Sequence, residues 1–198
     1  MIRVYLAVNP LYKAQKTLCE KRNEEILKVK NQKVYTEKLQ VWLLLEHALK
    51  DCGFDLKKLN FEKLPSGKWI ADGVEFSLSH SKGVFAVAIS DEPVGVDVQK
   101  HTLINHARLA QKILSTEELK EYENLSSKDK NEHIIKKWTE KESLFKAYEK
   151  GDLKYCQLSN LNYLTQVKDF EFLGEKYSIS VSSKTDKKVE FVIVKYFD

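Results

Sequence analysis

The stretch KKWTEKESLFKAY, Lys136–Tyr148, reads as a helix that carries an ammonium group within its apolar stripe. At 100° per residue its large apolar side chains fall within one narrow arc, and Lys141 lies inside that arc. Glu142 and Lys146 follow along one flank, four residues apart. Such a pair is common on helix surfaces, and a lysine can extend its ammonium to solvent, so an ordinary helix is one interpretation. A polyanion held beside the helix is the other.

Composition indicates an ordinary globular protein. The chain has 198 residues, of which 42% are hydrophobic, and this is enough to bury a core in one large domain or in two small halves. The net charge is +4 with 31% charged residues, a mild basic bias that falls short of a dedicated nucleic-acid binder. An acidic partner or a phosphate-rich ligand would suit this charge.

No segment indicates a membrane or a secreted protein. The longest apolar run, Val41–Leu45, is far shorter than the roughly 20 residues that cross a bilayer. The apolar stretch that opens the chain is too short for a signal peptide, so we expect a cytoplasmic protein. Cys19, Cys52 and Cys156 are odd in number and form no CxxC pair, which argues against a disulfide framework and a zinc site.

Two strong helices are expected. Apolar residues recur at helical spacing over Tyr35–Leu49, and Gly53 supplies a stop. The opening stretch belongs to a helix over Asn131–Lys150 that Gly151 closes. A capping-box pattern at Ser115–Glu118 begins a further helix between them.

Alternation with a period of two predicts strands at the start, in the middle and at the end of the chain. The predicted strands are Ile2–Val8, Val74–Ser81, Val84–Ser90, Val94–Val98, Tyr177–Val181 and Val189–Tyr196. The middle three should form one antiparallel unit, and a polar turn, SSKTDKK, joins the last two. The fold class is therefore α+β, with two similar halves, residues 1–99 and 100–198.

Two polar groups of residues stand out within the predicted strands. In PVGVDVQK, Asp97 and Gln99 point to one face, and Gly95 on that face leaves the approach to the carboxylate open. In FSLSHSKG, Ser79 and His80 precede a glycine, and a histidine among hydroxyls suits an anion. Taken singly, a solvated aspartate and a core histidine are common, so each group alone is a weak signal.

The ordered set of motifs is more specific. SGKW, SLSHSKG, GVDVQ and WTEKESLFK follow one another in the order and with spacings similar to those of the 4′-phosphopantetheinyl transferases of the larger, surfactin-synthetase-activating type. The chain resembles that family over most of its length. The resemblance implies a transferase fold of two similar halves related by pseudo-twofold symmetry.

The resemblance also implies a metal site and its neighbours. Asp97 and Glu142 would hold Mg²⁺ against the diphosphate of coenzyme A, the substrate, while Lys146, with help from Lys141, would neutralise the remaining charge. Mg²⁺ needs only one or two carboxylates, with waters and phosphates completing its shell. Gln99 stands where the family often has glutamate, so we expect a weaker metal site, or a water in its place.

The same resemblance implies the contacts to the rest of coenzyme A. Ser79 and His80 would contact a phosphate, and Lys68 in the GK turn would lie beside the adenosine. Basic residues of the first half would meet the 3′-phosphate, and three are candidates. They are Lys28, Lys30 and Lys38.

The implied reaction makes a holo-carrier protein. A serine hydroxyl of an apo acyl or peptidyl carrier protein attacks coenzyme A, takes the phosphopantetheine arm and releases 3′,5′-ADP, with Glu142, or a water that it orients, accepting the proton. Carrier proteins of fatty acid, polyketide and peptide synthesis all fit this description. One monomer would suffice, and neither nucleic acid nor membrane is expected as a partner.

Two alternatives belong to other classes. The first is a lysine-rich RNA-binding module that stacks bases on Tyr5, Tyr12 and Tyr35, although the near balance of 33 basic and 29 acidic residues argues against it. The second is an inactive relative that binds carrier protein, for which Gln99 is the only indication. A transfer assay separates these alternatives from the enzyme.

Overall fold

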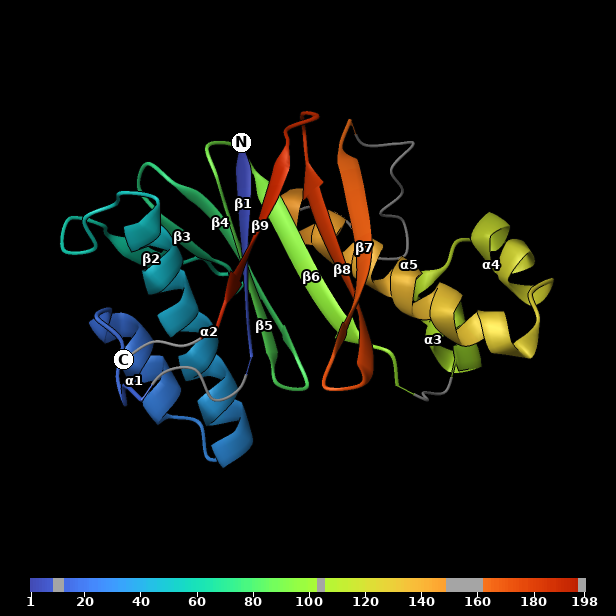
Figure 1. The fold of residues 1–198 in the computed structure, drawn as a ribbon, viewed down its shortest axis with the longest axis horizontal. Coiled ribbons are helices and arrows are strands. Elements are labelled where there is room, and N and C mark those ends of the chain that lie inside the picture. The colour runs from blue at the N-terminus through green and yellow to red at the C-terminus, as the bar shows by residue number, and fades with distance from the viewer. Residues whose placement is uncertain (9–12, 103–105, 149–161, 196–198) are drawn as a thin grey trace. The chain divides into compact units, whose positions relative to one another are not determined.

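The computed structural model describes residues 1–8, 13–102, 106–148 and 162–195 (Figure 1). The chain divides into two compact units: unit 1 comprises Met1–Glu92 with Lys187–Asp198, and unit 2 comprises Pro93–Asp186. Both units combine β-sheet with helices, which confirms the α+β class.

Unit 1 is built on a four-stranded sheet in the order β4-β5-β1-β9. Its strands are β1 (Ile2–Val8), β4 (Glu75–Ser81), β5 (Val84–Ser90) and β9 (Val189–Val194). β1 pairs antiparallel with β5 and parallel with β9, so the two ends of the chain meet in one sheet. A separate hairpin of β2 (Phe61–Lys63) and β3 (Trp69–Ala71) completes the unit.

Two helices complete unit 1: α1 (Glu20–Leu27) and α2 (Gln32–Asp51). The centre of α2 is apolar on several sides, and its side chains enter the core together with residues of β1 and β5. Trp42 is fully buried, and its ring meets the edge of Trp69 with 5.0 Å between ring centroids. The helix ends as expected, because Gly53 adopts φ +86, which a residue with a side chain rarely tolerates.

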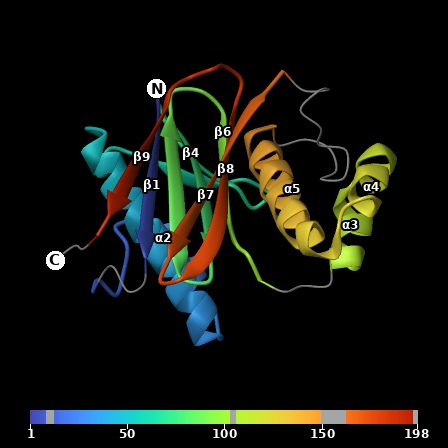
Figure 2. The ribbon, with the colours of Figure 1, turned by 45° about the vertical axis from the view of Figure 1, so that its right-hand side comes forward.

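Unit 2 has a three-stranded antiparallel sheet in the order β6-β8-β7, formed by β6 (Val94–Lys100), β7 (Leu164–Phe172) and β8 (Glu175–Ser183). The long helix α5 (Ser127–Tyr148) packs against it. Two short helices, α3 (His106–Ile113) and α4 (Thr116–Glu123), lie on the other side of α5 (Figure 2). The predicted capping box at the start of α4 is present.

The strand pairing differs from the sequence prediction in two places. The strand that contains Asp97 does not join the β4–β5 hairpin but pairs with β8 in the other sheet. The last two strands, β8 and β9, do not pair with each other; β9 pairs with β1 instead. As a result the compact units divide at residues 92 and 93 rather than at 99 and 100, and residues 187–198 belong to the first unit.

β7 was not predicted at all, because most of its residues are exposed or half-buried and its apolar alternation is weak. Some predictions lie outside the described residues. They are the end of the long helix at Gly151, the end of the last strand at Tyr196, and the residues Cys156 and Tyr12.

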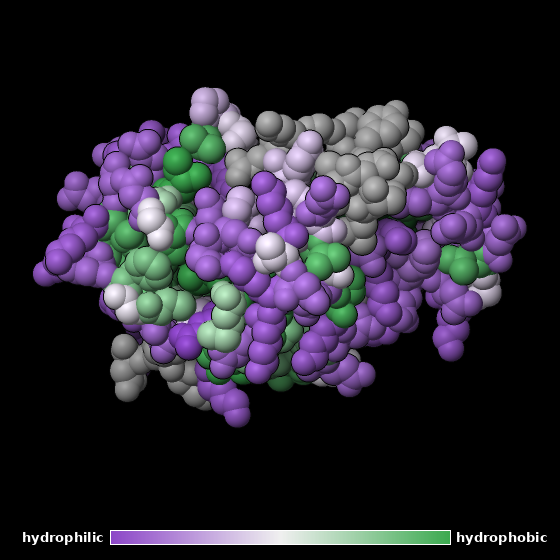
Figure 3. Space-filling model, turned by 90° about the horizontal axis from the view of Figure 1, so that it is seen from above, coloured by the Kyte–Doolittle hydropathy of each residue, from purple (hydrophilic) through white to green (hydrophobic). Residues whose placement is uncertain are grey.

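One face of the molecule is mainly polar. Figure 3 shows one face, on which hydrophilic residues predominate and apolar residues gather in a few groups. None of the helices that the structure describes combines the length and the apolar character that crossing a bilayer demands.

Candidate functional site

α5 lies directly against β6 at Gly95. A Cβ atom added to Gly95 would come 1.8 Å from the carbonyl oxygen of Ser143 and 2.8 Å from the backbone nitrogen of Ala147. The hydroxyl of Ser143 also lies 2.8 Å from that of Ser182 on β8, so the helix is fixed to both strands. The glycine therefore admits the helix backbone; the interpretation that it keeps the approach to the carboxylate open was wrong.

Both oxygens of the Asp97 carboxylate are bound within unit 2. The Lys146 ammonium donates to Oδ1 at 2.7 Å and to the Val96 carbonyl at 3.1 Å. The Gln99 amide donates to Oδ2 at 3.2 Å. Asp97 is only 3% exposed, which means that its charge depends on these partners.

Glu142 lies on α5, and the charges of Asp97 and Lys146 act on it. Burial raises the pKa of Glu142, and the negative charge of Asp97 raises it further, whereas the cations Lys146 and Lys112 lower it. The charge of Asp97 therefore disfavours the ionised form of Glu142. A cation shared between them would relieve this repulsion.

These residues fit a magnesium ion. In the part of the chain that the structure describes, no cluster of three or more His, Cys, Asp and Glu side chains could hold a metal. Magnesium does not require one, because it is bound through one or two carboxylates plus waters and substrate phosphates. Asp97 and Glu142 supply two, and Lys146 shows that a cation is already favoured at Asp97.

Gln99 is hydrogen-bonded to Asp97. The sequence left open whether Gln99 contributes to a weaker metal site or a water takes its place, and in the structure its amide nitrogen donates to the Asp97 carboxylate. In this position Gln99 orients the carboxylate and adds no negative charge.

The structure explains why Lys141 lies within the apolar stripe of α5. Its side chain is only 3% exposed, and its ammonium lies 2.7 Å from Oε2 of Glu118 on α4. The same carboxylate oxygen accepts a hydrogen bond from the backbone nitrogen of Ser115 in the capping box. An internal carboxylate therefore neutralises Lys141, and no bound polyanion is needed to explain its burial.

The SHS segment lies at the end of β4 in unit 1. Lys82 (φ 47) and Gly83 (φ 88) form a two-residue turn directly after it, of the kind that closes tight hairpins. His80 is exposed, with its Nδ1 3.8 Å from the Glu37 carboxylate. Ser79, by contrast, is buried. His80 is therefore the member of this pair that is more accessible to a ligand.

The other basic candidates of unit 1 differ in their surroundings. Lys28 lines a cavity of about 470 Å³, and Lys30 is exposed. Lys38 donates to Oε1 of Glu25 at 3.0 Å. Lys68 is half-buried in the predicted GK turn between β2 and β3, where its carbonyl accepts from a backbone nitrogen of the same turn. Glu25 also accepts hydrogen bonds from Arg22, Lys63 and Trp69.

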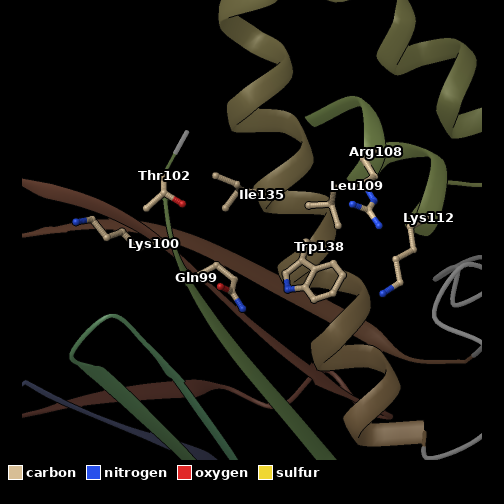
Figure 4. A pocket seen from close by; sticks show the side chains of 8 residues that line it. All are labelled: Gln99, Lys100, Thr102, Arg108, Leu109, Lys112, Ile135 and Trp138. Carbon is tan, nitrogen blue, oxygen red and sulfur yellow. The ribbon is translucent and has the colours of Figure 1, made fainter. Parts of the chain in front are cut away.

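A larger cavity of about 520 Å³ adjoins Gln99 in unit 2 (Figure 4). It lies among the end of β6, α3 and α5. Among the described residues, its lining includes cationic, neutral polar and apolar side chains but no carboxylate. The lining residues are Gln99, Lys100, Thr102, Arg108, Leu109, Lys112, Ile135 and Trp138.

Comparison with known proteins identifies a family for the chain. A family model described as the 4′-phosphopantetheinyl transferase superfamily matches residues 93–194, more than half of the chain. The chain belongs to this superfamily. It is also similar to a 4′-phosphopantetheinyl transferase of Aneurinibacillus migulanus, with 29% identity over 136 residues that cover 67% of this chain and 56% of that protein. The chain thus matches little more than half the length of this relative.

Two features of this phosphopantetheinyl transferase superfamily member were missed by sequence reasoning. The cavity beside Gln99 was one, although Arg108 and Lys112, four residues apart on α3, give a signal that could have been followed. The partner of Lys141 was the other, because Glu118 lies on a different helix. Asp97, Gln99 and Lys146 are joined by hydrogen bonds in unit 2, and the charges of Asp97 and Lys146 act on Glu142.

Proposed function

We propose that this transferase moves the 4′-phosphopantetheine arm of coenzyme A to a serine of an apo acyl or peptidyl carrier protein. The serine oxygen bonds to the β-phosphorus, the bond from that phosphorus to its bridging oxygen breaks, and 3′,5′-ADP leaves with the electron pair. The observation that carries the proposal is the meeting of Asp97, Glu142 and Lys146 in one unit of a chain that belongs to this superfamily.

Magnesium is the proposed cofactor. Asp97 and Glu142 would hold it, and Gln99 would orient Asp97 for that purpose. The ion would supply positive charge to the diphosphate as negative charge grows on the leaving oxygen.

Lys146 would exchange its partner Asp97 for a substrate phosphate when the metal and the substrate bind. Its side chain is 27% exposed, and in this structure its ammonium neutralises the buried Asp97. If another cation took over that task, the ammonium could pair with a substrate phosphate. Glu142, on the same helix, is the candidate to accept the serine proton.

Residues of unit 1 are the proposed contacts to the other end of coenzyme A. His80 is exposed and suits a phosphate, whereas the buried Ser79 would help mainly by shaping the end of β4. Lys28, Lys38 and Lys68 are the proposed contacts to the nucleotide. Lys28 lines a cavity that also contains Glu24, Glu25 and Glu62, so the cavity itself does not favour Lys28 over the other two lysines for the 3′-phosphate. The +4 net charge would favour encounter with an acidic carrier protein.

A transfer assay tests the proposal. The chain, coenzyme A, Mg²⁺ and a panel of apo carrier proteins are mixed, and the mass of each carrier protein is measured. We expect one or more of them to gain the arm, and D97A and E142A each to slow transfer by about 100-fold or more because each removes charge at the reacting phosphate.

Glu140→Ala is the matched control, since Glu140 lies on the same helix but pairs with Lys137. It should transfer at the unaltered rate. Transfer that persists in both D97A and E142A would overturn the proposed site, and carrier binding without transfer would indicate an inactive relative.

A further inference from the structure

A buried hydroxyl on β8 is left without a hydrogen-bond partner. The side chain of Ser180 is 0% exposed, and its Oγ atom is unpaired among the residues that the structure describes. A buried polar group that makes no hydrogen bond costs free energy, and proteins pair the large majority of such groups. The Ser180 hydroxyl therefore needs an explanation beyond the packing of the fold.

The strand register places Ser180 opposite Asp97. The two residues are direct partners in the antiparallel pair of β8 and β6, so their side chains leave the same face of the sheet. This face is the one that α5 covers, because the Ser182 hydroxyl, two residues along β8, lies 2.8 Å from that of Ser143. Directly opposite residues have Cβ atoms about 4.5–5.5 Å apart, so a serine hydroxyl can reach a carboxylate across the pair by rotation about χ1.

The serines on either side of Ser180 on this face are already paired. Ser178 donates to the Asp169 carboxylate at 2.6 Å, and the Ser182 hydroxyl lies 2.6 Å from that of Thr165. Both serines are as fully buried as Ser180. The unpaired hydroxyl is thus a property of the position opposite Asp97 and not of the whole row of serines.

The partners of Asp97 explain why this hydroxyl is idle. The two carboxylate oxygens accept from the Lys146 ammonium at 2.7 Å and from the Gln99 amide at 3.2 Å. Of these two donors, Lys146 is the one proposed to turn to a substrate phosphate. Its departure would remove a donor from a carboxylate that is only 3% exposed, and the hydroxyl across the strand pair can supply another.

We propose that Ser180 is a positioning residue, whose hydroxyl donates to the Asp97 carboxylate once Lys146 has turned to the substrate. The inference rests on the proposed function, and it adds a residue that holds the carboxylate proposed to bind the metal. Carboxylates that bind metal ions are themselves held by hydrogen bonds, and loss of such a partner weakens metal binding about 10- to 100-fold. In the free chain the same hydroxyl stays unpaired, at a cost in stability.

Two variants of Ser180 test the inference in the metal-free chain. S180A removes the hydroxyl, whereas S180C replaces it with a thiol that is a weak donor and fills the space, so that lost volume is separated from the lost hydrogen bond. We expect both variants to raise the urea midpoint, because each removes an unpaired buried hydroxyl. S178A is the matched control on the same face, and it should lower the midpoint because Asp169 loses its donor.

The same variants are then compared in metal binding. Binding of Mn²⁺, a paramagnetic substitute for Mg²⁺, is measured from the loss of the EPR signal of the free ion. S180A and S180C should bind Mn²⁺ about tenfold or more weakly than the unaltered chain, and the Mg²⁺ concentration for half-maximal transfer should rise by a similar factor. S178A should leave both quantities unchanged.

A second test needs no metal. K146Q removes the ammonium from Asp97 in the free chain, so the Ser180 hydroxyl should then pair with the carboxylate. In that background S180A should lower the urea midpoint, although it raises the midpoint of the chain that retains Lys146. Such a reversal of sign in a double-mutant cycle reports coupling between the two residues.

The remaining outcomes contradict the inference. A lower urea midpoint for S180A with Lys146 present would mean that the hydroxyl is already bonded in the free chain. Unchanged Mn²⁺ binding in S180A, or the same sign of effect with and without Lys146, would give Ser180 no part at Asp97. If the unaltered chain bound no Mn²⁺ and did not transfer the arm, the proposed function itself would fail, and that result is seen without any variant of Ser180.

Discussion

Lys141 and Lys146 lie on the same helix, yet their ammonium groups have different surroundings. Lys141 is 3% exposed and paired with Glu118, a carboxylate within unit 2. Lys146 is 27% exposed and paired with Asp97, the carboxylate proposed to hold the metal. The first pair ties α5 to α4, whereas the second can open when a competing cation binds. At the residue scale, then, the contacts of Lys141 indicate a structural role, whereas the chemical role of Lys146 is the one proposed above.

Lys141→Met tests this division. Removing the ammonium leaves the half-buried Glu118 without its cation. The loss of one partner of a fully buried pair costs about 3–5 kcal/mol, and the partial exposure of Glu118 places this loss at or below the lower end of that range. We expect the free energy of unfolding, measured in urea, to fall by an amount of this order. E118Q combined with K141M should recover much of the loss, because neither charge is then left alone.

A Lys141 that serves mainly to bind coenzyme A predicts the opposite pattern. In that case K141M would leave the urea midpoint unchanged and weaken binding of coenzyme A.

Among the elements, α5 is held to the sheet of unit 2 by two different kinds of contact. Near its C-terminal half, backbone meets backbone at Gly95, and no side chain separates helix and strand. Nearer its start, Lys136 bridges Glu132 of the helix and Asp169 of β7, at 2.7 and 2.9 Å, and Lys176 of β8 bridges the same two carboxylates at 2.9 and 3.4 Å. The four charges form a closed ring of alternating sign.

The ring should make the free energy of unfolding depend on pH in the acid range. Burial alone would raise the pKa of Asp169, but hydrogen bonds from Ser178 and Lys136 outweigh it and lower this pKa to about 2. Hydrogen bonds from Lys136 and Lys176 lower the pKa of Glu132 to about 2 as well. Because both folded-state values lie below the ordinary ones, the stabilisation is complete above about pH 4.5 and is lost as the pH falls towards 2.

Asp169→Asn provides the measurement. Urea midpoints of the unaltered protein and of the variant, recorded from pH 6 to pH 2, should differ most at pH 6 and converge as the pH approaches 2. Carboxylates outside the ring titrate alike in both proteins, so their effect cancels in the difference. Glu132 shares Lys136 and Lys176 with Asp169, so its contribution is part of the measured difference. A difference that stays constant over this range would show that the Asp169 charge contributes nothing.

The whole molecule shows which features sequence could predict. The helix over Tyr35–Leu49, the capping box at Ser115 and the stop at Gly53 depend on neighbours a few residues away, and each was predicted correctly. The other long helix was also predicted, but it begins at Ser127 rather than Asn131. The grouping of Asp97 with Glu142 was predicted from resemblance and is consistent with their electrostatic interaction. Strand partners were not predictable, because alternation identifies a strand and says nothing about which distant strand it joins.

The pairing of β9 with β1 in unit 1 is the clearest example of a strand partner that could not be predicted from sequence. Val4 of β1 pairs with Phe191 of β9, although the two residues lie near opposite ends of the chain. Sequence order placed β9 with β8, while the structure places β9 in the sheet of unit 1. If the division into units is energetic as well as geometric, a fault in β9 should loosen unit 1.

Val194→Asp is the variant that decides this point. Val194 is 3% exposed and belongs to the core of unit 1, so a carboxylate there is buried without a partner and should cost roughly 2–5 kcal/mol. Ile193→Asp is the neighbouring control, because Ile193 is 58% exposed and surface changes stay within about 0.5 kcal/mol. In native-state hydrogen exchange, V194D should speed exchange of the amides of β1 and β5 while those of β8 keep their protection, because β8 pairs only with β6 and β7 among the described strands. Loss of protection in β8 with β1 unaffected would instead place the last strand energetically with the second half of the chain.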